Sequence, residues 1–229
     1  YVKKNINKVI TVSEFSKNDI SKLFNIKLKD IIVLGNALGF DKEKNSILYK
    51  RNLNLKYENY IVIGGPIHKK KGGDEIIRLC SELKKNKSDL KIYITGGVDK
   101  NFKEAYSKAN LSNTKVFQVL NVAEIVKMVE NALCYIQLSN YESFGIMVIE
   151  AMYLGTPVII NDIPGLKEVS NGNSIICNNK DTKLIISKIE KLDNDTKYRI
   201  KNIRNGIEHA KNFNWEIFAN KLIKKIENI

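Results

Sequence analysis

The chain has 229 residues, 43% of them hydrophobic, so it is long enough to bury a substantial core in one or two domains. It carries 38 lysines and arginines against 25 aspartates and glutamates, and this net charge of +13 is spread along the chain. Its apolar runs fall far short of the roughly 20 residues that a membrane-spanning helix needs. Three cysteines without CxxC spacing and only two histidines argue against a zinc site and indicate a reducing compartment.

The positive charge leaves several kinds of partner open. Its simplest source is a lysine-rich composition that covers helix faces, but attraction to phosphate-bearing substrates or to an anionic membrane surface has the same signature. The 10 tyrosines and 8 phenylalanines are not interleaved with basic residues as in an RNA-stacking sheet, and no helix-turn-helix or zinc-finger spacing occurs. We therefore expect no nucleic acid partner.

Short β-branched runs alternate along the chain with longer segments whose apolar residues recur at helical spacing. Strands are predicted at residues 9–12, 31–34, 60–63, 90–95, 115–118, 133–138 and 157–161. Helices are predicted between most of these strands, at about 14–24, 72–86, 100–110, 122–130 and 144–154. After residue 176 the pattern is helical to the end, at about 180–192, 196–212 and 215–228.

This alternation is typical of βαβ units. Strands joined by crossover helices run parallel, and a parallel sheet needs helices on both of its faces. The predicted fold class is therefore α/β, a doubly wound parallel sheet with a helical C-terminal segment. The polar, charge-rich stretch from Asp41 to Lys56 separates the first βαβ unit from the next strand, and it is the best candidate for a linker.

Turn residues and glycines follow the predicted strands at the ends where an open parallel sheet binds ligands. Glycines there let the backbone approach a ligand closely, and the helix that follows offers unpaired amides and a positive dipole end to an anion. A phosphate-bearing small molecule fits this pattern. Ordinary βα loops need the same residue types, so both interpretations stay open at this point. The four loops begin at Gly64-Gly65-Pro66, Gly96-Gly97, Ser139-Asn140-Tyr141 and Asp162-Ile163-Pro164.

The segment from Glu142 to Met152 is more specific. Ser143 is predicted to cap a helix, which places Glu142 just before the helix and Glu150 about two turns into it. Amides of the first turn, over 144–147, would then hold a diphosphate while the two carboxylates bind hydroxyl groups on either side of it. The alternative is a capping carboxylate followed by an ordinary solvated helix glutamate.

Glu142 and Glu150 resemble the E-x7-E motif of the retaining GT-B glycosyltransferases that use nucleotide sugars, the glycosyltransferase group 1 or family four type. The resemblance continues through the segments 155–159, 164–168 and 171–173, and it covers nearly the whole chain. It implies a Rossmann-like lobe of a GT-B fold. Residues 1–40 would be the last βαβ unit of the N-terminal acceptor lobe, 41–58 a linker, 59–212 the nucleotide-sugar-binding domain and 213–229 the closing helix.

The resemblance also implies roles for individual residues. In that family the first glutamate contacts the donor sugar, the second holds the ribose hydroxyls, and a lysine on an earlier loop binds the diphosphate. These roles fall on Glu142, Glu150 and Lys71, with Lys71 and Glu142 as the catalytic pair. The remaining donor-binding positions are Gly65, Val119, Leu120, Phe144, Gly145 and Ile146.

Two positions depart from the pattern of that family. Pro66 stands where an arginine is expected, and a proline has no donor for a phosphate, so Lys69, Lys70 or His68 compensates or donor binding is altered. Val119, in the region with Leu120 that receives the base, replaces a glycine. Pro66 therefore supports an alternative function, a non-catalytic lobe or subunit that binds a nucleotide sugar.

The resemblance further implies the reaction and its partners. The donor would be a UDP- or GDP-sugar, the acceptor a glycan or a lipid-linked molecule, and the reaction a hexosyl transfer with retention of configuration. Neither a cofactor nor a metal is expected. We expect a cytoplasmic protein, peripheral on the cytoplasmic membrane face where the acceptor is lipid-linked. Because only the end of the acceptor lobe is present, residues 1–229 alone are expected to bind the donor without transferring its sugar.

Overall fold

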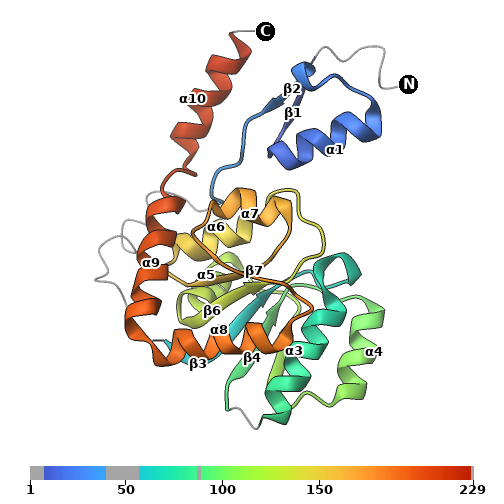
Figure 1. Cartoon of the computed structure of the whole chain (residues 1–229), viewed down its shortest axis with the longest axis vertical. Coiled ribbons are helices and arrows are strands. Elements are labelled where there is room, and N and C mark those ends of the chain that lie inside the picture. The colour runs from blue at the N-terminus through green and yellow to red at the C-terminus, as the bar shows by residue number, and fades with distance from the viewer. Residues whose placement is uncertain (1–7, 40–56, 87–88, 228–229) are drawn as a thin grey trace.

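The computed structural model describes residues 8–39, 57–86 and 89–227, which contain two parallel sheets (Figure 1). The smaller sheet pairs β1 (Val9–Thr11) with β2 (Ile31–Val33), and α1 (Glu14–Phe24) forms most of the crossover between them, followed by the short 3₁₀ helix η2 (Leu28–Asp30). Ser13 caps α1 by accepting a hydrogen bond from the Ser16 amide. The first predicted βαβ unit is confirmed.

The larger sheet has six parallel strands in the order β5-β4-β3-β6-β7-β8. The chain first builds outward from β3 to β5 and then returns to the other side of β3, so β3 and β6 are the neighbours at which the winding direction changes. In open α/β sheets the ligand crevice lies at such a switch point, outside the carboxyl ends of the strands. The strands are β3 (Glu58–Gly64), β4 (Lys91–Thr95), β5 (Thr114–Phe117), β6 (Ala132–Gln137), β7 (Val158–Asn161) and β8 (Ile175–Cys177).

Helices cover both faces of this sheet, which confirms the doubly wound α/β class. Two separate apolar clusters fill the two helix–sheet interfaces. One face carries α3 (Gly73–Lys85), α4 (Lys100–Ala109) and α8 (Thr182–Asn194). The opposite face carries α5 (Val122–Glu130), α6 (Ile146–Tyr153) and α7 (Pro164–Ser170). The C-terminal helices α9 (Thr196–Ala210) and α10 (Trp215–Ile226) follow, and α10 extends to the side of the molecule where β1, α1 and β2 lie (Figure 1).

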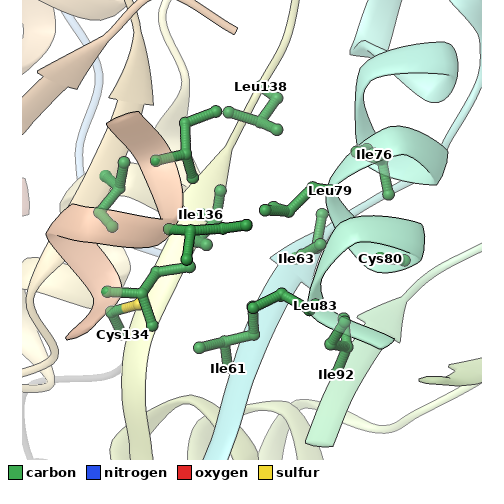
Figure 2. Packing of buried hydrophobic residues seen from close by; sticks show 14 of the residues in the cluster. Ile61, Ile63, Ile76, Leu79, Cys80, Leu83, Ile92, Cys134, Ile136 and Leu138 are labelled. Carbon is green, nitrogen blue, oxygen red and sulfur yellow. The ribbon is translucent and has the colours of Figure 1, made fainter. Parts of the chain in front are cut away.

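Strand β3 shows why the strands of the larger sheet are unbroken apolar runs in the sequence. Its side chains alternate between the two clusters, with Ile61 and Ile63 on one face and Tyr60 and Val62 on the other. Figure 2 shows Ile61 and Ile63 lying against the helix that carries Leu79. Because both faces are buried, neither set of alternating positions needs to be polar.

Two short elements differ from the prediction. Strand β8 has three residues and α7 has seven, and neither was expected, because segments this short give too few positions for a period to be recognised. The other predicted strands and helices are present with ends shifted by a few residues. Of the predicted linker 41–58, positions 41–56 lie outside the described residues.

Candidate functional site

Two loops meet at the switch point between β3 and β6. The loop after β3 contains a 3₁₀ helix, η3 (Lys69–Lys71), and the loop after β6 leads into α6. The Lys70 carbonyl accepts hydrogen bonds from the Asn140 amide, at 2.8 Å, and from the Tyr141 amide, at 3.2 Å. Backbone contacts therefore join the two loops just before Glu142.

Lys71 and Glu142 form an ion pair across this junction. The Lys71 Nζ atom donates to Glu142 Oε1 at 2.6 Å and is also bonded to the second carboxylate oxygen, although the two residues are 71 positions apart. Their side chains are 22% and 14% exposed, so water screens the pair less than it screens a surface ion pair. The structure thus brings the two predicted catalytic residues together, with their charges neutralising one another.

Gly72 allows the close approach that positions Lys71. Its φ of +78° lies in the left-handed region, and a Cβ atom at this position would lie 2.1 Å from the Leu138 carbonyl oxygen. Only glycine combines this backbone conformation with contact against the end of β6. The ammonium group of Lys71 therefore reaches the β6 loop because the next residue has no side chain.

Asparagines hold the β6 loop from the other side. Asn161, at the end of β7, donates to the Ser139 carbonyl at 2.8 Å and accepts from the Asn179 amide at 2.9 Å. The side-chain amide of Asn179 in turn donates to Leu138 O at 3.1 Å and to Asn140 Oδ1 at 2.9 Å. Sequence reasoning missed this network. The available signal was a set of asparagines at or just beyond the ends of three neighbouring strands, where buried polar groups need partners.

Helix α6 begins later than predicted. Gly145, with φ of +81°, is the N-cap residue and Ile146 the first helical residue, so the expectation that Ser143 caps this helix is wrong. The physical reason is Phe144, which is only 7% exposed and fills the core between the loop and the helix. The amides without intrahelical partners are consequently those of Ile146 and Met147 rather than Phe144. Of the predicted donor-binding residues in this segment, Phe144 has its side chain in the core.

Glu150 lies inside α6 and is buried, being only 9% exposed, which contradicts its interpretation as an ordinary solvated helix glutamate. Burial raises the pKa of its carboxyl group, and a hydrogen bond from the Gly39 backbone amide lowers that pKa in part. An added Cβ at Gly39 would lie 3.1 Å from Glu150 Oε1, so the backbone at Gly39 lies close to this carboxylate. The segment after β2 therefore reaches the second predicted glutamate.

The raised pKa of Glu150 predicts a pH dependence of stability. The unfolded chain releases this proton near the ordinary glutamate pKa, whereas the folded protein retains it to higher pH, so stability contributed below that pKa is lost as pH rises. Glu150→Gln retains an oxygen that accepts from Gly39 but cannot ionise. We expect the free energy of unfolding of Glu150→Gln, relative to wild type, to increase as pH rises above the ordinary glutamate pKa, measured by urea denaturation. A pH-independent difference would contradict this assignment.

Gly65 lies against the neighbouring strand, whereas Val119 and Leu120 lie at the edge of the sheet. A Cβ at Gly65 would lie 2.1 Å from the Thr95 carbonyl oxygen, so the loops after β3 and β4 touch there. Val119 and Leu120 follow β5, two strands away from β3, and Val119 is 90% exposed. Gly65 therefore lies in the same loop as Lys71, close to the ion pair in sequence. Val119 lies apart from that loop and is exposed to solvent.

The second histidine of the chain, His209, has structural partners. His209 Nε2 lies 2.7 Å from the Val169 carbonyl oxygen, and its ring meets Phe213 edge to face. Among the described residues, no three histidines, cysteines or carboxylates are arranged to hold a metal ion. Within the same residues, no helix is both long enough and apolar enough to cross a membrane.

Comparison with known proteins identifies the family. A family model described as glycosyl transferases group 1 matches residues 44–209. An uncharacterised glycosyltransferase of Methanocaldococcus jannaschii is 27% identical over 218 residues, which are 94% of this chain and 58% of the relative. The capsular polysaccharide biosynthesis glycosyltransferase CapM of Staphylococcus aureus is 28% identical over 215 residues, which are 89% of this chain and 57% of the relative. The chain thus spans less than two thirds of the length of either relative.

Solved structures show the same architecture. Anabaena HepE, in a complex with UDP and glucose, matches with a TM-score of 0.80 at 15% identity, over 97% of this chain and 64% of that one. At this identity the likeness concerns the fold alone, and it agrees with a Rossmann-like lobe of the GT-B type. Because the family model covers more than half of the residues, the chain belongs to the group 1 glycosyl transferases.

Proposed function

We propose that this chain forms the donor-binding lobe of a retaining glycosyltransferase that uses a nucleotide diphosphate sugar. The observation that carries the proposal is the Lys71–Glu142 pair at the carboxyl ends of β3 and β6, with the buried Glu150 further along the helix that follows. A cation, a helix amino end and two carboxylates suit a ligand with a diphosphate and flanking hydroxyl groups.

In this proposal Lys71 and the first amides of α6 bind the diphosphate. Both are preorganised, since Gly72 fixes the loop of Lys71 and Gly145 fixes the start of the helix. As the sugar departs, negative charge builds on the β-phosphate, and these groups stabilise it without reorganising. They supply the positive charge that a metal ion provides in other transferases, so we propose a metal-independent reaction with no cofactor.

Glu142 would contact the donor sugar and Glu150 the ribose. The bond between the sugar anomeric carbon and the β-phosphate oxygen breaks while the acceptor oxygen bonds to the same face of that carbon, which retains the configuration. The acceptor proton passes to the departing phosphate oxygen. Positive charge develops on the sugar during this exchange, and in this proposal the Glu142 carboxylate would stabilise that charge.

The acceptor would be a glycan or a lipid-linked molecule held by an N-terminal lobe, of which β1, α1 and β2 form the last unit. Closure between two lobes excludes water from the reaction, so we expect this chain alone to bind the donor but not to transfer the sugar. The net charge of +13 also suits a peripheral position on the anionic cytoplasmic face of a membrane.

The second candidate is a lobe that binds the nucleotide sugar without catalysis. Pro66 favours it, because this exposed residue has no donor for a phosphate and stands where the resemblance leads us to expect an arginine. The exposed Lys69 and Lys70 next to the site offer substitute cations, which favours the enzyme. Release of nucleoside diphosphate from a nucleotide sugar by the intact protein separates the two candidates.

Thermal unfolding in the presence of UDP, GDP and ADP tests the donor site. A ligand at 100 to 1,000 times its dissociation constant stabilises the folded state by about 2.7–4.1 kcal/mol. We therefore expect at least one of the three to raise the melting temperature at millimolar concentration, equally with and without EDTA. Three nucleotides without effect would refute the proposed donor site, and a shift abolished by EDTA would refute the metal-independent part.

A further inference from the structure

Helix α1 contacts the residues on both sides of Glu142, although it belongs to the smaller sheet. The contacts involve the side chains of Ser13, Phe15, Ser16 and Asp19 on or next to α1 and the loop residues Tyr141 and Ser143.

The contact after Glu142 is made through the Ser143 carbonyl. Ser13 Oγ donates to this oxygen at 2.5 Å, and Ser16 Oγ lies 3.3 Å from it. Both serines are buried, at 2% and 7% exposure, so their hydroxyl groups are shielded from water although Ser143 itself is exposed. Ser13 is also the N-cap of α1, and its single side chain therefore fixes the start of α1 and the loop together.

The contact before Glu142 is made through Tyr141. Its hydroxyl group donates to Asp19 Oδ2 at 2.8 Å, and its ring packs against Phe15 with a centroid separation of 5.5 Å. The hydrogen bond to Asp19 raises the pKa of Tyr141, as expected for a hydroxyl that donates to a carboxylate. The backbone of Glu142 is thus held on either side by the same helix.

Helix α7 fixes α1 in turn. The carboxylate of Glu168 accepts hydrogen bonds from the Glu14 amide at 2.7 Å and from the Phe15 amide at 2.9 Å, at the positive end of α1. A Cβ at Gly165, also on α7, would lie 1.9 Å from the Glu142 carbonyl oxygen. Glu142 therefore lies where the β6 loop, α1 and α7 meet, with its carbonyl oxygen against Gly165.

We infer that α1 positions Glu142 for the donor sugar, with Ser13 and Asp19 as the positioning residues. The inference rests on the proposed function, in which Glu142 contacts the sugar and Lys71 the diphosphate. Loosening α1 should therefore weaken recognition of the sugar more than binding of the nucleotide. The quantity to measure is the sugar ratio, defined as the affinity for a nucleotide sugar divided by the affinity for the corresponding nucleoside diphosphate.

Tyr141→Phe is the cleanest variant because it removes one hydroxyl group and keeps the ring against Phe15. Tyr57→Phe is its matched control, since Tyr57 also donates to an aspartate, Asp193, next to β3 and α8 and away from this junction. Calorimetric titration of this chain with UDP, GDP and ADP, and with their glucose, galactose, mannose and N-acetylglucosamine conjugates where these exist, gives the sugar ratio. Glu142→Ala shows how far the ratio falls when the carboxylate itself is absent.

We expect Tyr141→Phe to lower the sugar ratio about fivefold, the usual effect of one lost hydrogen bond, while nucleoside diphosphate affinity stays within about twofold. Ser13→Ala should lower the ratio as much and also the melting temperature, because α1 loses its cap, whereas Ser13→Thr keeps the hydroxyl and the wild-type ratio. Asp195→Ala, which removes the cap of α9, should lower the melting temperature alone.

The outcomes distinguish a failure of the positioning role of α1 from a failure of the proposed role of Glu142. If Glu142→Ala lowers the ratio but Tyr141→Phe and Ser13→Ala do not, Glu142 keeps its proposed role and the positioning inference is overturned. If Glu142→Ala has the wild-type ratio, the role of Glu142 fails and the inference fails with it. An equal decrease in Tyr57→Phe would show a general effect of lost stability and would also overturn the inference.

Discussion

Glu142→Gln is expected to reduce sugar transfer by the intact protein about 10²- to 10³-fold while nucleoside diphosphate binding stays unchanged or becomes tighter. The variant has no negative charge to stabilise the developing positive charge on the sugar, so the transition state loses more than the ground state. Nucleotide binding does not suffer, because Lys71 is paired with Glu142 in the structure and the substitution releases its full charge for the diphosphate.

Lys71→Ala should behave differently from Glu142→Gln. It removes the cation and leaves the Glu142 carboxylate uncompensated beside the diphosphate, so both binding and transfer should fall. Glu82→Gln is a suitable control, since Glu82 pairs with Lys85 at 2.6 Å on the exposed side of α3 and should affect neither quantity. Wild-type transfer by Glu142→Gln would refute the assigned role, as would equal losses of binding in the Glu142 and Lys71 variants.

Gly72→Ala is expected to have the largest effect on stability. The left-handed backbone costs about 1–2 kcal/mol for a residue with a side chain. The new Cβ would lie 2.1 Å from the Leu138 carbonyl oxygen, and relieving that clash adds about 1–3 kcal/mol. Because relief moves the loop of Lys71 away from β6, nucleoside diphosphate binding should be lost as well. Urea denaturation and calorimetric titration measure the two effects.

Gly172 provides the matched control for this substitution. Its φ of +77° is nearly the same as that of Gly72, but no atom lies within 4 Å of an added Cβ. Gly172→Ala should therefore show only the cost of the left-handed backbone and should bind nucleoside diphosphate normally. Equal destabilisation in the two alanine variants would mean that contact between the loop and β6 contributes nothing to the site.

The sequence predicted the larger elements because parallel strands buried on both faces differ sharply from amphipathic helices. The run Ile61-Val62-Ile63 is recognisable as a strand for this reason, and α1 was predicted with its observed bounds. Strand β8 was missed because three residues define no period. The predicted start of α6 was wrong because serine and glycine are both suitable N-cap residues. Burial of Phe144 decides in favour of Gly145 over Ser143.

The candidate site was predictable in its residue types but not in its contacts. The resemblance named Lys71, Glu142 and Glu150, and the parallel topology placed their loops at one edge of the sheet. Which partner each group takes depends on packing between segments distant in the chain, as in the bond from Gly39 to Glu150. The asparagine network of Asn161 and Asn179 escaped detection for the same reason.

Amide chemical shifts recorded during titration with the nucleoside diphosphate that binds best would locate the donor site residue by residue. We expect the largest changes at residues 64–72 and 142–148, because the diphosphate would lie between Lys71 and the start of α6. Lys71→Ala should abolish these changes while leaving the rest of the spectrum intact. Changes confined to the opposite end of the sheet, or equal changes in Lys71→Ala, would contradict a donor site between β3 and β6.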